Sequence, residues 1–436
     1  MDMLDAVIVI IFAFIWAYLA WRMLDWAVTL VILFLPVYLI RFNVGPLPMT
    51  LLELMVIIVV VTWSWRAIQE RSRTHASSVF SPWRWLLIAW VVAGVLAVAI
   101  SPDVRAALGL WKAYIIEPAL FFIVFVNTIK TRQQVRGVVW ALGVLAVVIG
   151  FVTLLQYTNI LSIPGGYGLE SPARATGMFP FPTAVGKIIG PIMGLFLGLL
   201  FGAARLWRGT LWETVREHGF VIGVLTFSLV ALLFSVSRGA IAGVLVSLVV
   251  VSFFSRYRRA LWAGLLVMAV AALMIPAIRS NIMDVVQASD VSTDVRLVMW
   301  KGATRIIQDH PVLGTGLASF PVVYGDYKEA SHTEFFPNPD HLWLSLWIEM
   351  GLAGVVIFCI MMVRFFQMIR RALRQADAEV RSLAIGLMAA MIVLLVHGLL
   401  DTPYFKNDLA IQFWTLIGLA VTLRGLPAPQ EKIINS

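Results

Sequence analysis

The sequence predicts an all-α, polytopic integral membrane protein with about 12–13 transmembrane helices and one large loop outside the membrane. Of the 436 residues, 61% are hydrophobic and only 13% are charged, whereas a soluble domain carries about 25% charged residues. Apolar runs of about 20 residues, the length that crosses a bilayer, recur from end to end. A water-soluble multidomain fold is therefore disfavoured, and the bilayer is the solvent that shapes this chain.

Thirteen apolar segments are the predicted spans, and the first two are short enough to be divided differently. They lie near 4–20, 26–40, 50–65, 85–101, 112–127, 137–157, 183–203, 220–236, 240–254, 260–278, 343–364, 382–400 and 409–423. An acidic N-terminus precedes the first, and no small-residue cleavage site follows it. We therefore expect an uncleaved span rather than a signal peptide.

The distribution of basic residues predicts which loops face the cytoplasm, because Lys and Arg near helix ends stay on that side. One set of alternate loops holds 21 of the 33 basic residues and the other set holds 11, with Lys187 inside a span. We assign the set with 21 to the cytoplasm. Much of the net charge of +9 is therefore an orientation signal, and these loops do not argue for binding nucleic acid.

A hydrophilic segment over 279–341 is predicted on the opposite, external side. It is about sixty residues long, and loops of that length without a regular fold are usually functional. It is net acidic, with five basic and eight acidic residues. The few external arginines are therefore expected to be isolated positive charges at the depth of the lipid headgroups. A smaller external loop, rich in Gly and Pro, covers 158–178.

Two helices are predicted in and after the large external segment. Apolar residues at helical spacing from Val295 to Ile307 indicate an amphipathic helix lying along the outer membrane surface, with Arg296 and Trp300 on one face. At the far end, Asn338-Pro339 predicts the N-cap and first residue of a spanning helix. His341 then falls in its first turn, where the helix dipole favours a neutral imidazole. His341 could cap this helix or act as a general base.

Three external arginines are candidate phosphate ligands. Arg238 lies in Ser237-Arg238-Gly239 at a short turn between two spans, and Arg174 lies in the smaller loop. The third is Arg296. A guanidinium presents paired donors that match phosphate oxygens, and a lipid pyrophosphate carries its charge at headgroup depth. The alternative is that these arginines snorkel to lipid headgroups without a ligand.

Other ionisable residues near the outer halves of spans are secondary candidates, because charges inside a membrane are usually functional. They are Lys187, Glu53, Glu117, Glu349 and His397. The alternative is that they snorkel or pair with one another. No HExxH, DxD or closely spaced His pair occurs, so we expect no metal site. His310 and His332 are expected to be solvated, and the single cysteine, Cys359, to pack in an apolar run.

Several of these residues stand in motifs that resemble the O-antigen ligase family of bacterial membrane glycosyltransferases, which includes O-antigen polymerases. The motifs are Leu233-Phe234-Ser235-Val236-Ser237-Arg238-Gly239-Ala240, the helix with Arg296 and Trp300, His310-Pro311-Val312-Leu313-Gly314-Thr315-Gly316, and His341-Leu342-Trp343-Leu344 followed by Glu349-Met350-Gly351-Leu352-Ala353-Gly354. The resemblance covers about 220–365 and extends loosely to Arg174-Ala175-Thr176-Gly177 and to His397-Gly398 and Asp401. It divides the chain into N-terminal helices (1–219), an O-antigen-ligase-like core (220–365) and C-terminal helices with a tail (366–436).

The resemblance implies inverting, metal-independent glycosyl transfer without a cofactor on the periplasmic face of the inner membrane. The donor would be a glycan on undecaprenyl diphosphate, and the acceptor lipid A–core. By carry-over, Arg238 and Arg296, together with Arg174, would hold the donor diphosphate, and His341 would activate the acceptor hydroxyl. Lys187, Trp300 and Glu349 are possible supporting residues.

Three functions remain open at this point. The motifs do not separate a ligase from a polymerase that uses a second lipid-linked glycan as acceptor, although a single long loop with no large extra domain favours a ligase. A lipid-glycan transporter is the alternative without chemistry. The residues after Arg174, Met178-Phe179-Pro180-Phe181-Pro182-Thr183, depart from the Asn-Pro-Asn-like run of many relatives, which puts a substrate contact there in doubt.

Overall fold

The computed structural model describes residues 3–45, 47–69, 81–170, 172–202, 211–255, 258–259, 261–264, 291–329 and 337–426. Its helices are α1 (Met3–Arg22), α2 (Leu24–Leu33), α3 (Leu51–Gln69), α4 (Ser81–Ala99), α5 (Val104–Trp111), α6 (Glu117–Thr128), α7 (Arg132–Tyr157), α8 (Pro182–Gly202), α9 (Leu211–Ser235), α10 (Arg238–Phe254), α13 (Val291–Asp309), α14 (Phe320–Tyr327), α15 (Leu342–Ala372), α16 (Ala378–His397) and α17 (Asn407–Leu423). The remaining elements are the short helices η1 (Leu35–Leu39), η2 (Lys112–Ile116) and η3 (Pro164–Leu169) and an antiparallel hairpin of β1 (Arg41–Val44) and β2 (Leu47–Thr50).

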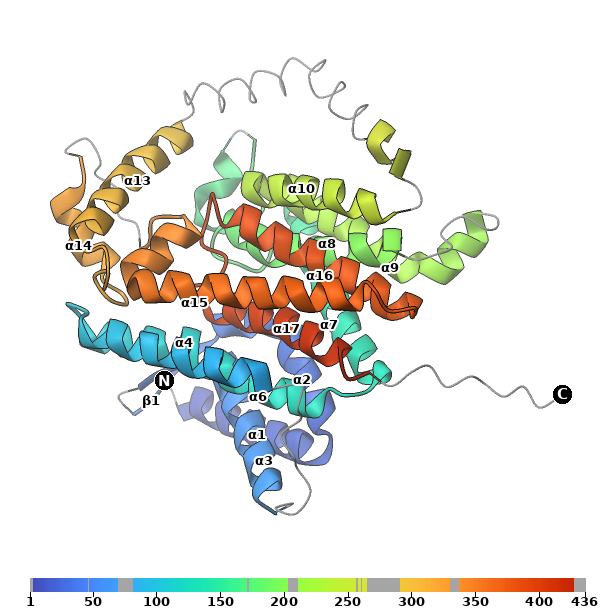
Figure 1. The fold of residues 1–436 in the computed structure, drawn as a ribbon, viewed down its shortest axis with the longest axis horizontal. Coiled ribbons are helices and arrows are strands. Elements are labelled where there is room, and N and C mark those ends of the chain that lie inside the picture. Colours follow the sequence, from blue (N-terminus) through green and yellow to red (C-terminus); the bar gives the residue numbers. More distant parts are fainter. Residues whose placement is uncertain are drawn as a thin grey trace.

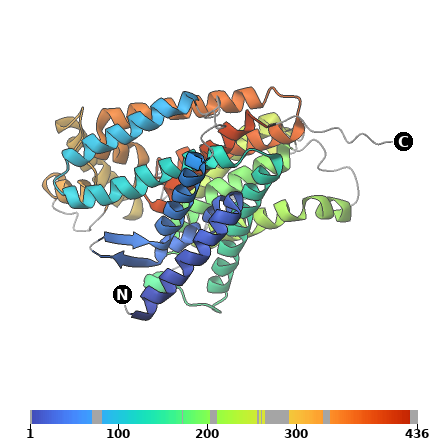
Figure 2. The same ribbon diagram turned by 90° about the horizontal axis from the view of Figure 1, so that it is seen from below.

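The predicted all-α polytopic fold is confirmed. Among the described residues, seven helical segments are long and apolar enough to cross a membrane, and five shorter apolar helices accompany them. These twelve correspond to twelve of the predicted spans, and the remaining one, near 260–278, lies almost entirely outside the described residues. In Figures 1 and 2, α13 and α14 stand at one end of the helix bundle, beside the start of α15, and the β1–β2 hairpin lies at the same end.

The pair α8 and α16 forms the centre of the bundle, with α10 packed against both. Glycines every fourth residue along α8 give it a smooth face toward α16. A Cβ added to Gly198 would lie 2.2 Å from the Cα of Gly386, and one added to Gly194 would lie 3.0 Å from the backbone of Ala389. Small residues let helix backbones approach closely in a membrane, where packing drives association. This close contact fixes where Lys187, on the first turns of α8, meets the end of α16.

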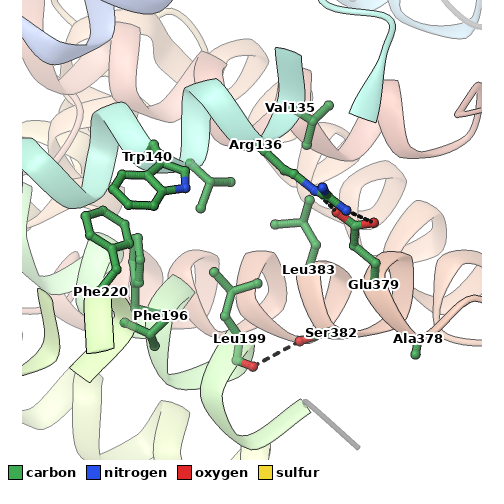
Figure 3. A pocket seen from close by; sticks show the side chains of 12 residues that line it. Val135, Arg136, Trp140, Phe196, Leu199, Phe220, Ala378, Glu379, Ser382 and Leu383 are labelled. Carbon is green, nitrogen blue, oxygen red and sulfur yellow. Dashed lines mark hydrogen bonds and ion pairs between the residues drawn. The ribbon is translucent and has the colours of Figure 1, made fainter. Parts of the chain in front are cut away.

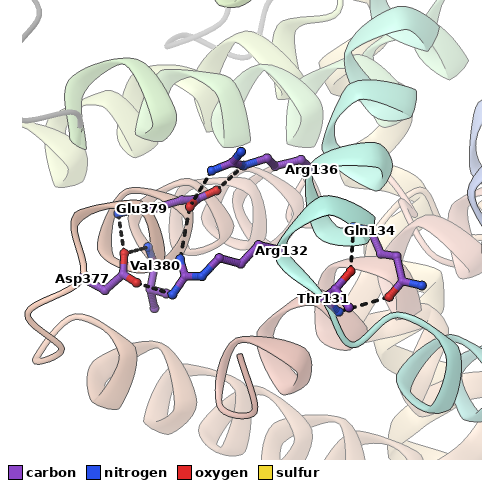
Figure 4. A network of polar contacts seen from close by, with 7 residues as sticks. All are labelled: Thr131, Arg132, Gln134, Arg136, Asp377, Glu379 and Val380. Carbon is purple, nitrogen blue, oxygen red and sulfur yellow. Dashed lines mark hydrogen bonds and ion pairs between the residues drawn. The ribbon is translucent and has the colours of Figure 1, made fainter. Parts of the chain in front are cut away.

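At the opposite end of this pair, charged residues fasten α7 to α16 (Figure 4). Arg132 at the start of α7 bonds to Asp377, the N-cap of α16, and its Nη1 donates to Glu379 at 3.1 Å. Arg136 donates two hydrogen bonds to the same Glu379, at 2.6 and 2.9 Å. Two arginines and two carboxylates compensate one another here, and we refer to these four residues as the α7–α16 clamp.

A cavity of about 380 Å³ lies beside the clamp, between α7, α8, α9 and α16 (Figure 3). Trp140, Phe196 and Phe220 line one side, and the Arg136–Glu379 ion pair closes another. The Trp140 and Phe220 rings stack with their centroids 3.6 Å apart. The lining is otherwise mostly apolar, as expected for a gap between spanning helices.

A loop docks on a break in α15. Gly351 has φ 64° inside the helix, a conformation that favours glycine, and the freed backbone groups bond to the loop instead. Thr315 N donates to Ile348 O at 2.7 Å, and Leu352 N donates to Val312 O at 2.9 Å. A Cβ on Gly314 would lie 2.4 Å from Ile348 O. The His310–Gly316 and Glu349–Gly354 motifs therefore interlock, and this contact sets the position of the start of α15.

Candidate functional site

A buried ion pair joins α8 to the turn after α16. Lys187 Nζ lies 2.6 Å from Asp401 Oδ1, and the side chains are 10% and 6% exposed. Asp401 Oδ1 also accepts from Thr402 N at 2.6 Å, and His397 Nε2 lies 3.9 Å from Asp401 Oδ2. Lys187 therefore pairs with Asp401, a residue that was not among the ionisable groups expected to pair with one another. The ion pair is satisfied on both sides, which a buried charge requires.

The turn that carries Arg238 packs against His397 and against Gly186 of α8, both close to this ion pair. A Cβ on Gly239 would lie 2.5 Å from Cδ2 of His397, and one on Gly186 would lie 1.9 Å from Oγ of Ser237. Both glycines are therefore required for the turn to lie between α8 and α16. Val236, just before the turn, has φ 51°, and the Arg238 side chain is exposed at the start of α10. The geometry holds the backbone tightly while leaving the guanidinium at the surface.

Arg174 is brought to the same turn by backbone pairing. Ala175 N donates to Phe234 O at 2.9 Å, and Arg174 Nε donates to Ser235 O at 3.4 Å. The side-chain oxygen of Gln156 at the end of α7 accepts from Thr176 N and Gly177 N at 3.0 and 2.8 Å, which holds the loop. Arg174 also lies 3.8 Å from Glu170. It is consequently not an isolated charge, contrary to the expectation from the sequence.

The predicted helix with Arg296 and Trp300 is present as α13, and protein covers its apolar face. Its Met299, Ala303 and Ile306 are fully buried with residues of α14 and α15, so the helix does not rest on the membrane surface with that face. Trp300 Nε1 donates to Pro339 O at 2.9 Å, and the Trp300 ring meets the His341 ring edge-on at a centroid distance of 5.1 Å. Trp300 thus positions the residues before α15.

Arg296 lies one turn before Trp300 on α13. Its charge acts on Asp340 and on His397, as does that of Lys187. Arg296 is therefore near a carboxylate, and the expectation of isolated external arginines is wrong for Arg296 as well. The structure brings Arg174, Arg238, Arg296 and Lys187 to one end of the bundle, around His397 and Asp401. We call these six residues, with Asp340 and His341, the polar cluster.

His341 is the N-cap of α15. Its Nδ1 accepts from Leu344 N at 3.3 Å, and the next residue, Leu342, donates its N–H to Gly398 O at 2.7 Å. Partial burial lowers the pKa of His341 below its ordinary value, so the imidazole is neutral at pH 7. Because Nδ1 accepts this bond, the ring proton lies on Nε2 in the neutral form. The structure therefore shows the capping role that the sequence left open.

The predicted N-cap, Asn338, does not begin the helix. Its Oδ1 accepts instead from Asp340 N at 3.0 Å and from Thr402 Oγ1 at 2.8 Å, and Asp340 has φ 45°. The Asn-Pro pattern is a common helix start, but here the asparagine oxygen accepts a hydrogen bond from a distant hydroxyl and does not cap the helix. The helix consequently starts three residues later than predicted, at Leu342, with His341 as its N-cap.

Asp340 is a member of the polar cluster that sequence reasoning missed. Burial and the neighbouring Asp401 raise its pKa to about 6, against the opposing effect of Lys187 and Arg296. Two carboxylates thus share the positive charge of two cations. In the sequence Asp340 is one of eight acidic residues in a long loop, and only its position beside His341 distinguishes it. Asp401 was noted only within a loose motif, whereas His397 was a secondary candidate among the ionisable residues near spans.

Glu349 lies apart from the polar cluster. It is 3% exposed and accepts a hydrogen bond from the backbone of Ala318 in the loop that docks on α15. Its second oxygen, Oε2, has no hydrogen-bond partner among the described residues. Glu53 and Glu117 pair with Lys112, at 3.1 and 3.8 Å. His332 and the rest of 330–336 lie outside the described residues.

Several residues of the polar cluster lie in a segment that matches a protein-family model. Residues 223–359 match a family model described as O-antigen ligase. This segment is therefore similar to the O-antigen ligase family. The similarity supports a membrane glycosyltransferase-type function. Arg238, Arg296 and His341 lie within the O-antigen ligase segment, whereas Lys187 and Asp401 lie outside it. No curated protein matches the chain.

Proposed function

We propose that the protein transfers a glycan from undecaprenyl diphosphate to a lipid A–core acceptor on the periplasmic face of the bacterial inner membrane, without a metal or cofactor. The observation that carries the proposal is the convergence of Arg238, Arg296 and Arg174 with His341 at one end of the bundle. The O-antigen ligase segment supplies the first two arginines and the histidine.

The arginines would bind the donor diphosphate and stabilise its departure. A diphosphate is a good leaving group that needs charge stabilisation more than protonation, and guanidinium groups supply bidentate donors. Asp340 and Asp401 offset part of the charge of Lys187 and Arg296, and the side chain of Arg238 is exposed at the start of α10. The glycan C1–O bond breaks, and its electron pair leaves with undecaprenyl diphosphate.

His341 would accept the proton of the attacking acceptor hydroxyl. The hydroxyl oxygen forms the new bond to C1 from the face opposite the diphosphate, which inverts the configuration. A neutral imidazole with a lowered pKa is suited to this role at pH 7. The accepting atom is Nδ1, where the hydroxyl replaces the long bond from Leu344 N at 3.3 Å. Trp300, edge-on to the ring, holds its orientation.

Reconstitution tests this function directly. Purified protein in nanodiscs receives lipid-linked donor and either lipid A–core or a second lipid-linked glycan, with EDTA present. Transfer to lipid A–core supports the ligase, and transfer only to the lipid-linked glycan identifies a polymerase. Absence of product with both acceptors, in protein that moves labelled lipid-linked glycan across a vesicle bilayer, would replace the proposal with a transporter. A requirement for divalent metal would contradict the metal-independent mechanism.

A further inference from the structure

A second cavity, of about 680 Å³, adjoins the polar cluster and is unused by the proposed chemistry. It lies between the β1–β2 hairpin, the start of α3, the α5–η2 junction and the turn before α17. Lys187, Asn338 and Thr402 line it, and they also belong to or contact the polar cluster. Neither Arg238 nor Arg296 lines it. The cavity therefore adjoins the polar cluster and is distinct from the place proposed for the diphosphate.

Positive charge predominates in the lining of this cavity. Four basic side chains line it, against one carboxylate, Glu53; the basic residues are Arg41, Lys112, Lys187 and Lys406. The counter-ions of two of these lysines do not line the cavity. Asp401 pairs with Lys187, and the fully buried Asp408 lies 3.7 Å from Nζ of Lys406. Lys112 pairs with Glu53 and Glu117. Within the described part of the chain, no ion pair joins the exposed Arg41 to a carboxylate.

Lys406 shows how the wall presents this charge. Its Nζ lies over the ring of Tyr38 at 4.2 Å and near the rings of Phe179 and Phe181 at 5.4 and 5.5 Å. Burial lowers the pKa of Lys406 to about 8; Asp408 opposes this, and Lys187 and Arg41 add to it. A cation in this situation gains a favourable interaction from any anion that enters the cavity.

The rest of the lining suits a sugar. Amide and hydroxyl side chains, which hydrogen-bond to hydroxyl groups, are supplied by Asn43, Thr50, Asn338, Thr402 and Asn407. Aromatic rings with broad apolar faces are supplied by Tyr38, Phe42, Tyr114, Phe181 and Phe405. Ligand sites typically combine apolar and aromatic walls with a few placed polar groups. With a volume of about 680 Å³, the cavity has room for more than one sugar ring.

We propose that this cavity binds an anionic saccharide, one that carries a phosphate or a carboxylate, as part of the acceptor glycan. The inference rests on the proposed function for its direction: the acceptor must reach the polar cluster from a side that the donor diphosphate does not occupy. Arg41 and Lys406 would contact the anionic group, while Asn338 and Thr402 would lie toward the reacting hydroxyl. The cavity thereby selects acceptors by charge.

Acceptor kinetics of a charge-reversal variant test the proposal. Arg41→Glu is compared with wild type on lipid A–core that retains its sugar phosphates and on the same acceptor after phosphatase treatment. We expect the KM for the phosphorylated acceptor to rise about tenfold, with little change in kcat and in the KM for the treated acceptor. Arg105→Glu is the matched control, because Arg105 is also exposed, in the neighbouring α5, and does not line the cavity. Equal effects on both acceptors, or none, would overturn the proposal.

Two further arms separate the possible failures. If charge discrimination follows a uronic acid in the donor glycan rather than the acceptor phosphate, the acceptor assignment is wrong. Saturation-transfer NMR with glucose 6-phosphate, and with glucose as the neutral probe, reports on the cavity independently of transfer. Wild type should bind glucose 6-phosphate more strongly than Arg41→Glu does. If wild type binds glucose 6-phosphate more strongly than Arg41→Glu but shows no transferase activity, the proposed function alone is refuted. Equal glucose 6-phosphate signals from wild type and Arg41→Glu would refute the cavity assignment.

Discussion

The two ends of the α8–α16 core carry similar charged residues in different settings. At the clamp, Arg132 and Arg136 meet Asp377 and Glu379, and the Arg136 side chain is 65% exposed. At the other end, Lys187 and Asp401 are 10% and 6% exposed. Within the clamp, Arg136 and Glu379 are 65% and 39% exposed and are solvated by water, whereas Lys187 and Asp401 depend on each other.

The difference shows which charges serve shape and which can serve chemistry. Exposed ion pairs contribute little, about 0–1 kcal/mol, and tolerate change. Burial and, after it, the neighbouring Asp401 raise the pKa of Asp340, and groups with perturbed pKa values gather where reactions occur. Both ends hold two cations and two carboxylates, but only the buried end also presents Arg238, Arg174 and a neutral histidine.

The largest expected effect is at His341, and it separates capping from chemistry. His341→Asn keeps a side-chain oxygen that caps helices well but removes the imidazole. We expect kcat to fall about 10²–10⁴-fold, the usual range for a general base, while thermal stability stays near that of wild type. His341→Ala should lose both activity and stability. Transfer by His341→Asn at close to the wild-type rate would limit His341 to its role as a cap.

Removing one carboxylate from each end tests the comparison itself. Asp401→Asn leaves Lys187 buried without its counter-ion and should lower the free energy of unfolding by about 3–5 kcal/mol. Glu379→Gln, at the clamp, should lower it by about 1 kcal/mol or less. Chemical denaturation in mixed micelles measures both, and Lys187→Met/Asp401→Leu should recover much of the loss. Equal losses in the two single variants would remove the distinction between the ends.

The fold could be predicted from the sequence because a bilayer imposes simple demands. Each span must be long, apolar and helical, so the lengths of apolar runs located twelve helices. The packing partners were less accessible. Lys187 and Asp401 meet because the glycines of α8 let α16 approach closely. The spacing of those glycines predicts a close helix contact but not which helix makes it.

The candidate site was predicted in part. Residue type and position singled out Arg238, Arg296 and His341, and the resemblance related them to one another. The start of α15 was predicted wrongly because the hydroxyl of Thr402, more than sixty residues away, donates a hydrogen bond to Asn338 Oδ1 at 2.8 Å. Glu349 belongs to the same motif as His341 but faces the docked loop. Its partner is the backbone of Ala318, which no side-chain pattern could indicate.

A smaller effect is expected from changing the shape of one exposed cation. Arg238→Lys keeps the charge but loses the two parallel donors, so transfer should fall about 10²-fold. Arg105→Lys is the matched control, since Arg105 is exposed and outside the polar cluster. Initial rates at saturating acceptor measure both variants. Wild-type rates in Arg238→Lys would indicate that Arg238 only contacts lipid headgroups.

The smallest effect should appear in the pH dependence of donor binding. The pKa of Asp340 is raised to about 6, so its carboxyl is ionised at pH 7.5 and mostly neutral at pH 5.5. Loss of that negative charge leaves Arg296 and Lys187 less compensated, and the donor diphosphate should bind about three- to tenfold more tightly at the lower pH. The same protonation favours the folded protein: because the folded-state pKa lies above the ordinary 3.8, this contribution to stability is present at low pH and is lost as the pH rises through about 6.

Asp340→Asn separates this titration from every other group, since it fixes the neutral state at all pH values. Its donor Kd, measured by equilibrium binding of labelled lipid-linked donor to protein in nanodiscs, should equal the low-pH value of wild type and stay flat from pH 5.5 to 7.5. The same variant distinguishes His341, because any pH dependence that arises from its imidazole would survive in Asp340→Asn. A pH dependence that survives in Asp340→Asn would place the titrating group elsewhere, and would mean that the buried end is no more responsive to charge than the clamp.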